Sequence, residues 1–178
     1  MINVKGTTKC EHVCDSCQFG KLSRLPFFRS EHSSSVIFEK IHCDLWGSAP
    51  VLSIEKFRYC VCLVDDFSKY TWIIPLLHKS DFVDAYFAFE HYVTRQFNKH
   101  IKVFHSDGGG EIINSKLSSH FLSTGVVHQI SCPYTSEQIS IVERRNRVIR
   151  ELGMTMLFHS GVPLSLWVEK LSLLLFIL

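Results

Sequence analysis

The sequence lacks three features that would assign it to a class at once: a strong net charge, a long apolar run and an even set of cysteines. Its 178 residues carry a formal charge of only +2, which does not by itself indicate a nucleic-acid-binding protein. The apolar run at Leu171–Leu178 is far shorter than the roughly 20 residues that cross a bilayer. We therefore expect no membrane partner.

The seven cysteines form an odd set, and Cys60 and Cys62 lie inside an apolar, strand-like run. No apolar segment of the kind found in signal peptides follows Met1. These observations predict reduced, intracellular thiols rather than a disulfide framework.

The composition is that of an ordinary globular protein, with 46% hydrophobic and 20% charged residues. A chain of this length holds one full core and a small appendage. We expect a cysteine-bearing head and linker over residues 1–36 and an α/β domain over residues 37–178.

The apolar patterns and turn signals predict eight main elements in the domain. Strands are expected at 38–45, 57–64, 70–76, 101–104 and 126–130, and helices at 81–97, 115–123 and 141–160, with a further helix opening at Leu164. Residues 131–140 contain Pro133 and polar residues without apolar periodicity, which predicts a mobile loop.

Three carboxylates stand out by their local settings. Asp44 follows a short apolar run, Asp107 precedes three glycines, and Glu143 opens a helix-like stretch. Between Asp107 and Glu143 lie 35 residues. Two strand-end aspartates and one helix-start glutamate suit a pair of hard divalent cations, which prefer oxygen ligands and activate a water or hydroxyl for attack on phosphorus.

Each acid also has a plain structural alternative. Asp44 and Asp107 could cap turns, and Glu143 could be a solvated residue in a first helical turn. Asp65 and Asp66 are adjacent, so on a strand they point to opposite faces and cannot both reach one metal pair. We interpret these two as turn residues, with Asp66 bonding the backbone of the turn that follows.

Four motifs, taken in order, resemble the integrase of copia-type retrotransposons, a branch of the retroviral integrase family. The matching stretches are His42-Cys-Asp-Leu-Trp-Gly-Ser-Ala-Pro50, Val64-Asp-Asp-Phe-Ser-Lys-Tyr-Thr-Trp72, His105-Ser-Asp-Gly-Gly-Gly-Glu111, and Pro133-Tyr-Thr-Ser-Glu-Gln138 followed by Val142-Glu-Arg-Arg-Asn-Arg147. The resemblance runs from about Cys14 to about Trp167. It implies a ribonuclease-H-like fold, a mixed five-stranded sheet flanked by helices, in which the first and fourth strands bring Asp44 and Asp107 together.

The resemblance also implies an enzyme that joins element DNA to target DNA by phosphoryl transfer. Asp44, Asp107 and Glu143 would hold two Mg²⁺ or Mn²⁺ ions, and Glu111 is the alternative third ligand. The implied partners are element ends and target DNA. The full-length parent would be a homo-oligomer that acts in the nucleus after a cytoplasmic particle stage.

The stretch after Glu143 is basic, with Arg144, Arg145, Arg147 and Arg150 close together. Helical spacing places Asn146, Arg147 and Arg150 on the face of Glu143, which predicts DNA contact beside the metals. The alternative is a solvated face with the intrahelical pairs Glu143–Arg147 and Arg147–Glu151. The opposite stripe, expected to face the core, is Val148, Ile149, Leu152 and Met156.

In the head, Cys14 and Cys17 resemble the second half of the family's His/His/Cys/Cys zinc knuckle. The family's two histidines would lie before this sequence, and the nearby Cys10 and His12 are not used in the family. We therefore expect Zn²⁺ only in the full-length parent, and a metal-free half-site is the alternative here.

Three residues, in two of the motifs, depart from the family pattern. Ile139-Ser140 stand where the family has Asn-Gly, and Gly108 stands where it has Asn. An inactive, nucleic-acid-binding remnant of an integrase is therefore the alternative function. A structural cellular nuclease of the same fold is a third, which the copia-like motifs disfavour.

Overall fold

The computed structural model describes residues 34–110, 112–131 and 136–175, within a compact unit formed by residues 33–178. For residues 136–143 and 175 it describes the backbone alone. The elements are, in chain order, β1 (Lys40–Gly47), β2 (Tyr59–Asp65), β3 (Thr71–Leu76), η1 (Lys79–Asp81), α2 (Phe82–Phe97), β4 (Val103–Ser106), α3 (Ser115–Thr124), β5 (Val127–Ile130), α4 (Ser136–Ser160), η2 (Leu164–Leu166) and α5 (Trp167–Leu175).

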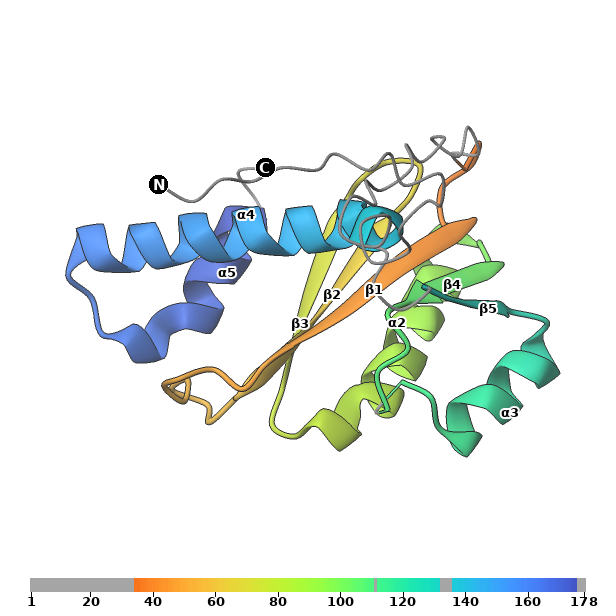
Figure 1. Cartoon of the computed structure of the whole chain (residues 1–178), viewed down its shortest axis with the longest axis horizontal. Helices are drawn as coiled ribbons and strands as arrows, with labels where there is room; N and C mark the ends of the chain where they lie inside the picture. Colours follow the sequence, from red (N-terminus) through yellow and green to blue (C-terminus); the bar gives the residue numbers. More distant parts are fainter. Residues whose placement is uncertain (1–33, 111, 132–135, 176–178) are drawn as a thin grey trace, which may run out of the picture. The chain divides into compact units, whose positions relative to one another are not determined.

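The five strands form one mixed sheet in the order β3-β2-β1-β4-β5 (Figure 1). β1 pairs antiparallel with β2 and parallel with β4, so it occupies the centre of the sheet. The predicted five-stranded architecture, with the first and fourth strands side by side, is confirmed.

The two faces of the sheet carry different helices (Figure 1). Along β1, Ile41 and Cys43 point into a core shared with α2 and α3, whereas Trp46 packs into a second core shared with α4 and α5. This alternation follows from the two-residue period of a strand. It leaves His42 and Asp44 on the α4 face together with Trp46.

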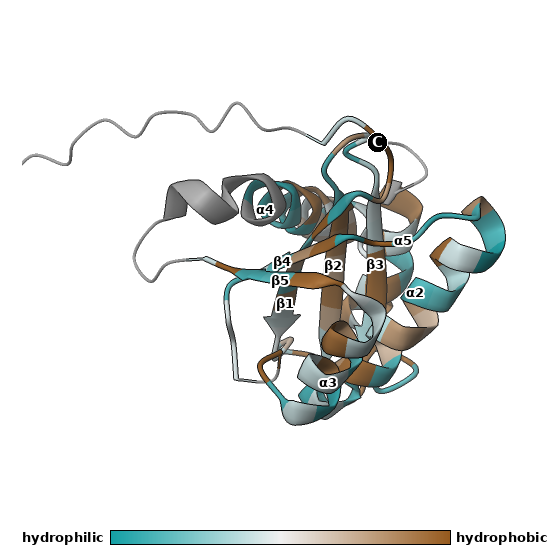
Figure 2. Cartoon of the chain, turned by 90° about the vertical axis from the view of Figure 1, so that its right-hand side faces the viewer, coloured by the Kyte–Doolittle hydropathy of each residue, from teal (hydrophilic) through white to brown (hydrophobic). Residues whose placement is uncertain are grey.

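The larger core is built from aromatic and aliphatic side chains of the sheet, α2 and α3. Phe104 of β4 lies against Tyr86 and Phe121, with ring centroids 4.9 and 5.5 Å apart respectively. β2 is buried along nearly its whole length and is drawn largely in brown in Figure 2. A strand buried on both faces needs this continuous apolar run.

Local sequence signals explain the ends of α2 and α3. α2 ends at Asn98 in the left-handed region (φ 50°), a conformation that asparagine tolerates. The side chain of Asn114 accepts a hydrogen bond from the Leu117 N–H at 2.8 Å, and Gly125 ends α3 at φ 76°. These caps fall within a residue or two of the predicted boundaries.

Two of the departures from the predicted boundaries bear on the site. β1 continues to Gly47 instead of ending at Leu45, because its last residues still pair with β2 through Tyr59. α4 begins at Ser136, so the loop predicted over 131–140 is helical from Ser136 onward. Glu137 and Gln138 favour helix without apolar periodicity, which explains the error.

The stripe of α4 that faces the core also differs from the prediction. Ile149 is buried as expected, but Val148 and Leu152 are 36% and 40% exposed. The other buried residues of the stripe are Asn146, Gly153 and Leu157. The buried stripe is therefore rotated around the helix, because α4 must contact both the polar end of β1 and the apolar side of α5.

Within the described part of the chain, no helix is long and apolar enough to span a bilayer.

Candidate functional site

Asp44 lies in β1, and Asp107 is the first residue after β4, the parallel neighbour of β1. The register of β1 and β4 pairs Lys40 with Val103 and His42 with His105. Asp44 lies two residues after His42, and Asp107 lies two residues after His105. Because side chains two residues apart on a strand point to the same face, each aspartate is expected on the face of the histidine before it. The expected pairing of these two strands is confirmed.

The two carboxylates differ in their surroundings. Burial raises the pKa of Asp44, and the negative charge of Asp107 raises it further. The hydrogen bond from Asn146 and the charge of Arg150 oppose this shift only in part. Asp107 is exposed and accepts a hydrogen bond from the Gly109 N–H at 3.0 Å, which orients it within the glycine turn.

Asn146 is the residue of α4 that contacts Asp44. Its side-chain amide donates a hydrogen bond to Asp44 Oδ2, and the residue is 4% exposed. We expected Asn146 to face DNA together with Arg147 and Arg150. The structure instead buries it as a partner of the carboxylate, because α4 crosses the end of β1 at this residue.

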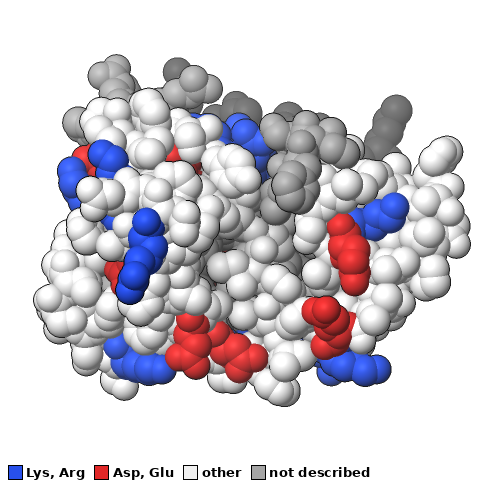
Figure 3. Space-filling model, turned by 180° about the vertical axis from the view of Figure 1, so that it is seen from behind, with Lys and Arg blue, Asp and Glu red and all other residues white. Residues whose placement is uncertain are grey.

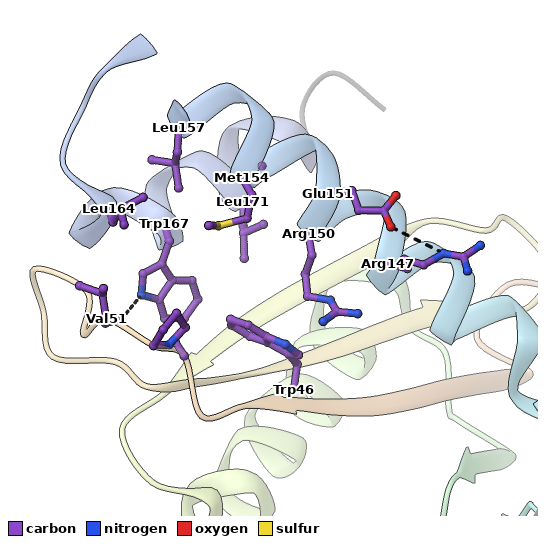
Figure 4. Close-up of a pocket in the computed structure, with 13 residues that line it drawn as sticks. Trp46, Val51, Arg147, Arg150, Glu151, Met154, Leu157, Leu164, Trp167 and Leu171 are labelled. Carbon is purple, nitrogen blue, oxygen red and sulfur yellow. Dashed lines mark hydrogen bonds and ion pairs between the residues drawn. The ribbon is translucent and has the colours of Figure 1, made fainter. Parts of the chain in front are cut away.

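The two arginines lie differently from each other (Figure 4). Arg147 is 64% exposed in its side chain and lies 4.0 Å from Glu151, the intrahelical pair considered above. Arg150 folds over the ring of Trp46, with 5.8 Å between its guanidinium carbon and the ring centroid. Arg147 thus remains accessible, while Arg150 is half-buried beside the carboxylates.

The sequence of the chain matches a known protein family. Residues 38–136 match the family model of the integrase core domain. The chain belongs to the integrase core domain family. It is 37% identical over 167 residues to the retrovirus-related Pol polyprotein from transposon RE2 of Arabidopsis thaliana, covering 93% of the chain and 11% of that polyprotein.

A second relative is the corresponding polyprotein from transposon TNT 1-94 of Nicotiana tabacum. It is 30% identical over 168 residues, which cover 94% of the chain and 12% of the polyprotein. This integrase core therefore spans about a tenth of the length of the polyproteins it matches.

Solved structures show the same fold at low sequence identity. The simian T-cell lymphotropic virus intasome, in complex with PP2A regulatory subunit B56 gamma, superposes with a TM-score of 0.70 at 15% identity, covering 93% of this chain and 56% of that one. The HTLV-2 integrase catalytic core domain, in complex with magnesium in a trimeric form, gives a TM-score of 0.54 at 16% identity, covering 77% and 84%.

The third predicted acid, Glu143, is part of α4, three residues before Asn146. Its side chain is outside the described part, as are Glu111 and the Cys14–Cys17 half-site. Among the side chains that are described, no group of three His, Cys, Asp or Glu could hold a metal ion. The described part of the site is therefore the Asp44–Asp107 pair with Asn146.

A pocket of about 460 Å³ lies beside Arg147 and Arg150 on the integrase core (Figure 4). It lies between the end of β1, α4 and α5. Trp46 and Trp167 meet edge to face in its wall, 5.6 Å between centroids. The Arg150 Nε atom is buried there without a hydrogen-bond partner among the described residues. The lining is mostly apolar, and its two cationic side chains are Arg147 and Arg150.

Two buried histidines, His42 and His105, lie on the carboxylate face, and their contact was not predicted from the sequence. The Nδ1 atoms of His42 and His105 are 2.9 Å apart. Burial lowers the pKa of His42. The pKa of His105 is lowered to about 4, mainly by burial and to a smaller extent by the charge of His42. The available signal was a histidine two residues before each aspartate, which places it on the same strand face.

Of the two expected turn residues, Asp65 rather than Asp66 bonds the backbone of the turn that follows. Asp65 makes the turn, accepting hydrogen bonds from the Ser68 N–H at 2.8 Å and from the Phe38 N–H at 2.7 Å. Asp66 reaches back to His42 Nε2 at 3.2 Å. Burial alone would raise the pKa of Asp66, but bonds from Ser34, Lys69 and His42 together hold it well below its usual range.

The surface opposite the view of Figure 1 carries separate groups of described Lys and Arg side chains, several of them beside Asp or Glu (Figure 3). Charge on this face is thus largely balanced. Elsewhere among the described residues, Lys116 forms an ion pair with Asp84 at 2.7 Å.

Proposed function

We propose that the chain is the catalytic core of a retrotransposon integrase, which inserts element DNA into target DNA by strand transfer. The observation that supports this proposal most is the parallel pairing of β1 with β4, the strand that Asp107 directly follows, together with the charge of Asp107 acting on Asp44 beside α4. Position 143 lies on the same helix as Asn146, three residues earlier, and residues three apart share a helix face. This supports Glu143 as the third acid of a D,D-x35-E site.

The donor set fits a divalent cation. Two carboxylates lie close enough for the charge of Asp107 to raise the pKa of Asp44, and a cation between them would stabilise both in the ionised form. Asp44, Asp107 and Glu143 would hold two Mg²⁺ or Mn²⁺ ions. When bound, such ions polarise a phosphoryl oxygen and lower the pKa of the attacking water or hydroxyl.

The remaining groups of the site bind and orient. Asn146 fixes the direction of the Asp44 carboxylate through its hydrogen bond. Arg147, with its exposed guanidinium, would contact DNA phosphates, which fixes the register of the duplex without reading its sequence. Arg150 adds positive potential next to the carboxylates from its place over Trp46.

Other properties of the parent protein stay proposals. The intasome and the trimeric catalytic core among the structural neighbours support an oligomeric assembly on DNA. We also propose nuclear action for the parent, and a zinc-binding head completed by residues outside this sequence.

One observation favours the alternative of an inactive, DNA-binding remnant. Ile139 and Ser140, which replace the Asn-Gly of related sequences, lie inside the continuous helix α4. A site that needs a flexible segment at this place would lose it.

Strand transfer with purified protein distinguishes the two functions. We would use labelled duplexes with the terminal sequences of transposons RE1 and RE2, a supercoiled target, and Mg²⁺ or Mn²⁺. Glu143→Gln should abolish joining yet leave DNA affinity nearly unchanged, because it removes a ligand charge without adding bulk. DNA binding without joining by the unsubstituted protein would establish the remnant. Joining retained in Glu143→Gln would promote Glu111 in its place.

A further inference from the structure

The buried histidine pair lies directly before the carboxylates on the two central strands. The parallel register of β1 and β4 ends at His42 and His105, and Asp44 and Asp107 lie two residues further on the same face. His42 is 4% exposed and His105 is 8% exposed. The side-chain contact between the rings is thus the last described cross-strand link before the aspartates.

Hydrogen-bond geometry assigns a direction to each bond. Asp66 is an acceptor, so His42 Nε2 carries the hydrogen of the 3.2 Å contact. His42 Nδ1 then accepts, and the 2.9 Å contact requires His105 Nδ1 to donate. His105 Nε2 is then an acceptor for the Ser131 hydroxyl, which lies 3.1 Å from it and 3.3 Å from the Ser106 carbonyl, the other acceptor within reach of its hydrogen. Both imidazoles are neutral in this arrangement, in opposite tautomers.

Both ends of this chain of bonds are fixed to the backbone. Asp66 accepts the Ser34 N–H at 2.8 Å and the Ser34 hydroxyl at 2.9 Å. At the other end, the Ser131 N–H donates to the Ser106 carbonyl at 2.9 Å. The Val-Asp-Asp motif therefore anchors the histidines, and no part of the chemistry proposed above uses it.

We propose that His42 and His105 are positioning residues: the bond series Ser131–His105–His42–Asp66 holds the ends of β1 and β4 at a fixed spacing, and so sets the separation of Asp44 and Asp107. The role of the carboxylates rests on the proposed function, but the bond series and its effect on strand spacing do not. A histidine pair of this kind suits the place because neutral imidazoles satisfy one another when buried, without adding charge next to two carboxylates.

Nitrogen-15 NMR of the histidine side chains tests the bond series. At pH 7 the Nε2–H tautomer is expected for His42 and the Nδ1–H tautomer for His105. A doubly protonated ring, or any other pair of tautomers, would overturn the proposal.

Two matched variants of His105 test the effect on spacing. His105→Asn keeps a donor at the Nδ1 place and loses the Ser131 bond, whereas His105→Gln keeps an acceptor at the Nε2 place and loses the His42 bond. Each loses one bond, so stability should fall similarly. Amide hydrogen exchange at residues 43–45 and 106–108 should be about tenfold faster in His105→Gln than in His105→Asn. His120→Gln on α3, whose Nε2 contacts Glu90 of α2 rather than a strand residue, is the control and should leave this exchange unchanged.

Calorimetric titration with Mn²⁺ adds a second readout. His105→Gln should bind Mn²⁺ at least tenfold more weakly than His105→Asn, which should stay near the unsubstituted protein. Equal exchange rates in the two variants would overturn the positioning role, as would equal Mn²⁺ affinities when the unsubstituted protein binds Mn²⁺. The unsubstituted protein could show the expected tautomers and exchange but bind no Mn²⁺. That result would support the role of the bond series in strand spacing and refute the proposed metal-dependent function.

Discussion

Asn146 donates a hydrogen bond to Asp44 across 102 residues of sequence, and this bond joins α4 to the centre of the sheet. It opposes the effect of burial on the pKa of Asp44. It also fixes the rotation of α4, because the residue at the crossing with β1 must be the one that satisfies the buried carboxylate.

Asn146→Ala should lower the free energy of unfolding by about 1–3 kcal/mol, because it leaves the half-buried Asp44 carboxylate without its amide donor. The pKa of Asp44 should rise further, since the lost bond favours the ionised form. Urea denaturation at neutral pH measures the stability change. Thr155→Ala, which removes an exposed side chain from the same helix, is the control and should change stability little. Equal stability of Asn146→Ala and the unsubstituted protein would contradict the prediction.

Asp44→Asn should make the protein more stable at neutral pH. The folded-state pKa of Asp44 is raised above its ordinary value of 3.8. Its contribution to stability is therefore fully present below the unfolded pKa and is lost as pH rises through the folded pKa. The advantage of Asp44→Asn should vanish at acid pH and grow between these two pKa values. Urea unfolding of both proteins across this range measures it, and a difference independent of pH would argue against a raised pKa.

Arg147→Ala should weaken DNA binding and reduce the slope of log affinity against log salt by about one unit, because one phosphate contact is lost. Fluorescence anisotropy with a short duplex at several salt concentrations provides the measurement. Lys116→Ala removes an equally accessible cation, 62% exposed in its side chain, from α3 and serves as the control. An unchanged slope for Arg147→Ala would return this residue to a solvated helix face.

Cys43, Cys60 and Cys62 should resist thiol reagents until the chain unfolds. They are 0%, 2% and 1% exposed, and burial raises the pKa of the Cys60 thiol to about 12. Since the thiolate is the reactive form, labelling in native buffer should be negligible at all three. Mass spectrometry of the three peptides after iodoacetamide, with and without urea, checks this. Rapid native labelling of any one of them would show that its strand opens.

Several parts of the fold were predictable because their signals are local. The strand β3 and the helix α3 follow from apolar spacing, and Asn114 and Gly125 mark the helix ends through backbone chemistry of a few neighbouring residues. The alignment of Asp44 with Asp107 followed from the order of the elements and the family resemblance. The proposed roles of Asp44, Asp107 and Glu143 stay predictions, because no structural observation tests them.

The face of α4 could not be predicted in this way. A helical period gives a stripe of apolar residues, and Val148 with Leu152 formed an acceptable one in the sequence. The structure exposes both and buries Asn146 and Gly153, since the neighbours of α4 are a carboxylate of β1 at one place and Leu171 of α5 at another.

The histidine bond series shows the same division most directly. The sequence by itself determined that His42 precedes Asp44 and that His105 precedes Asp107, each by two residues on one strand face. Only the tertiary structure decided that the two rings meet, and that Asp66 rather than Asp65 receives the bond from His42. The reason is physical: strand period is a property of a few adjacent residues, whereas the partner of a buried polar group depends on which distant strand lies beside it.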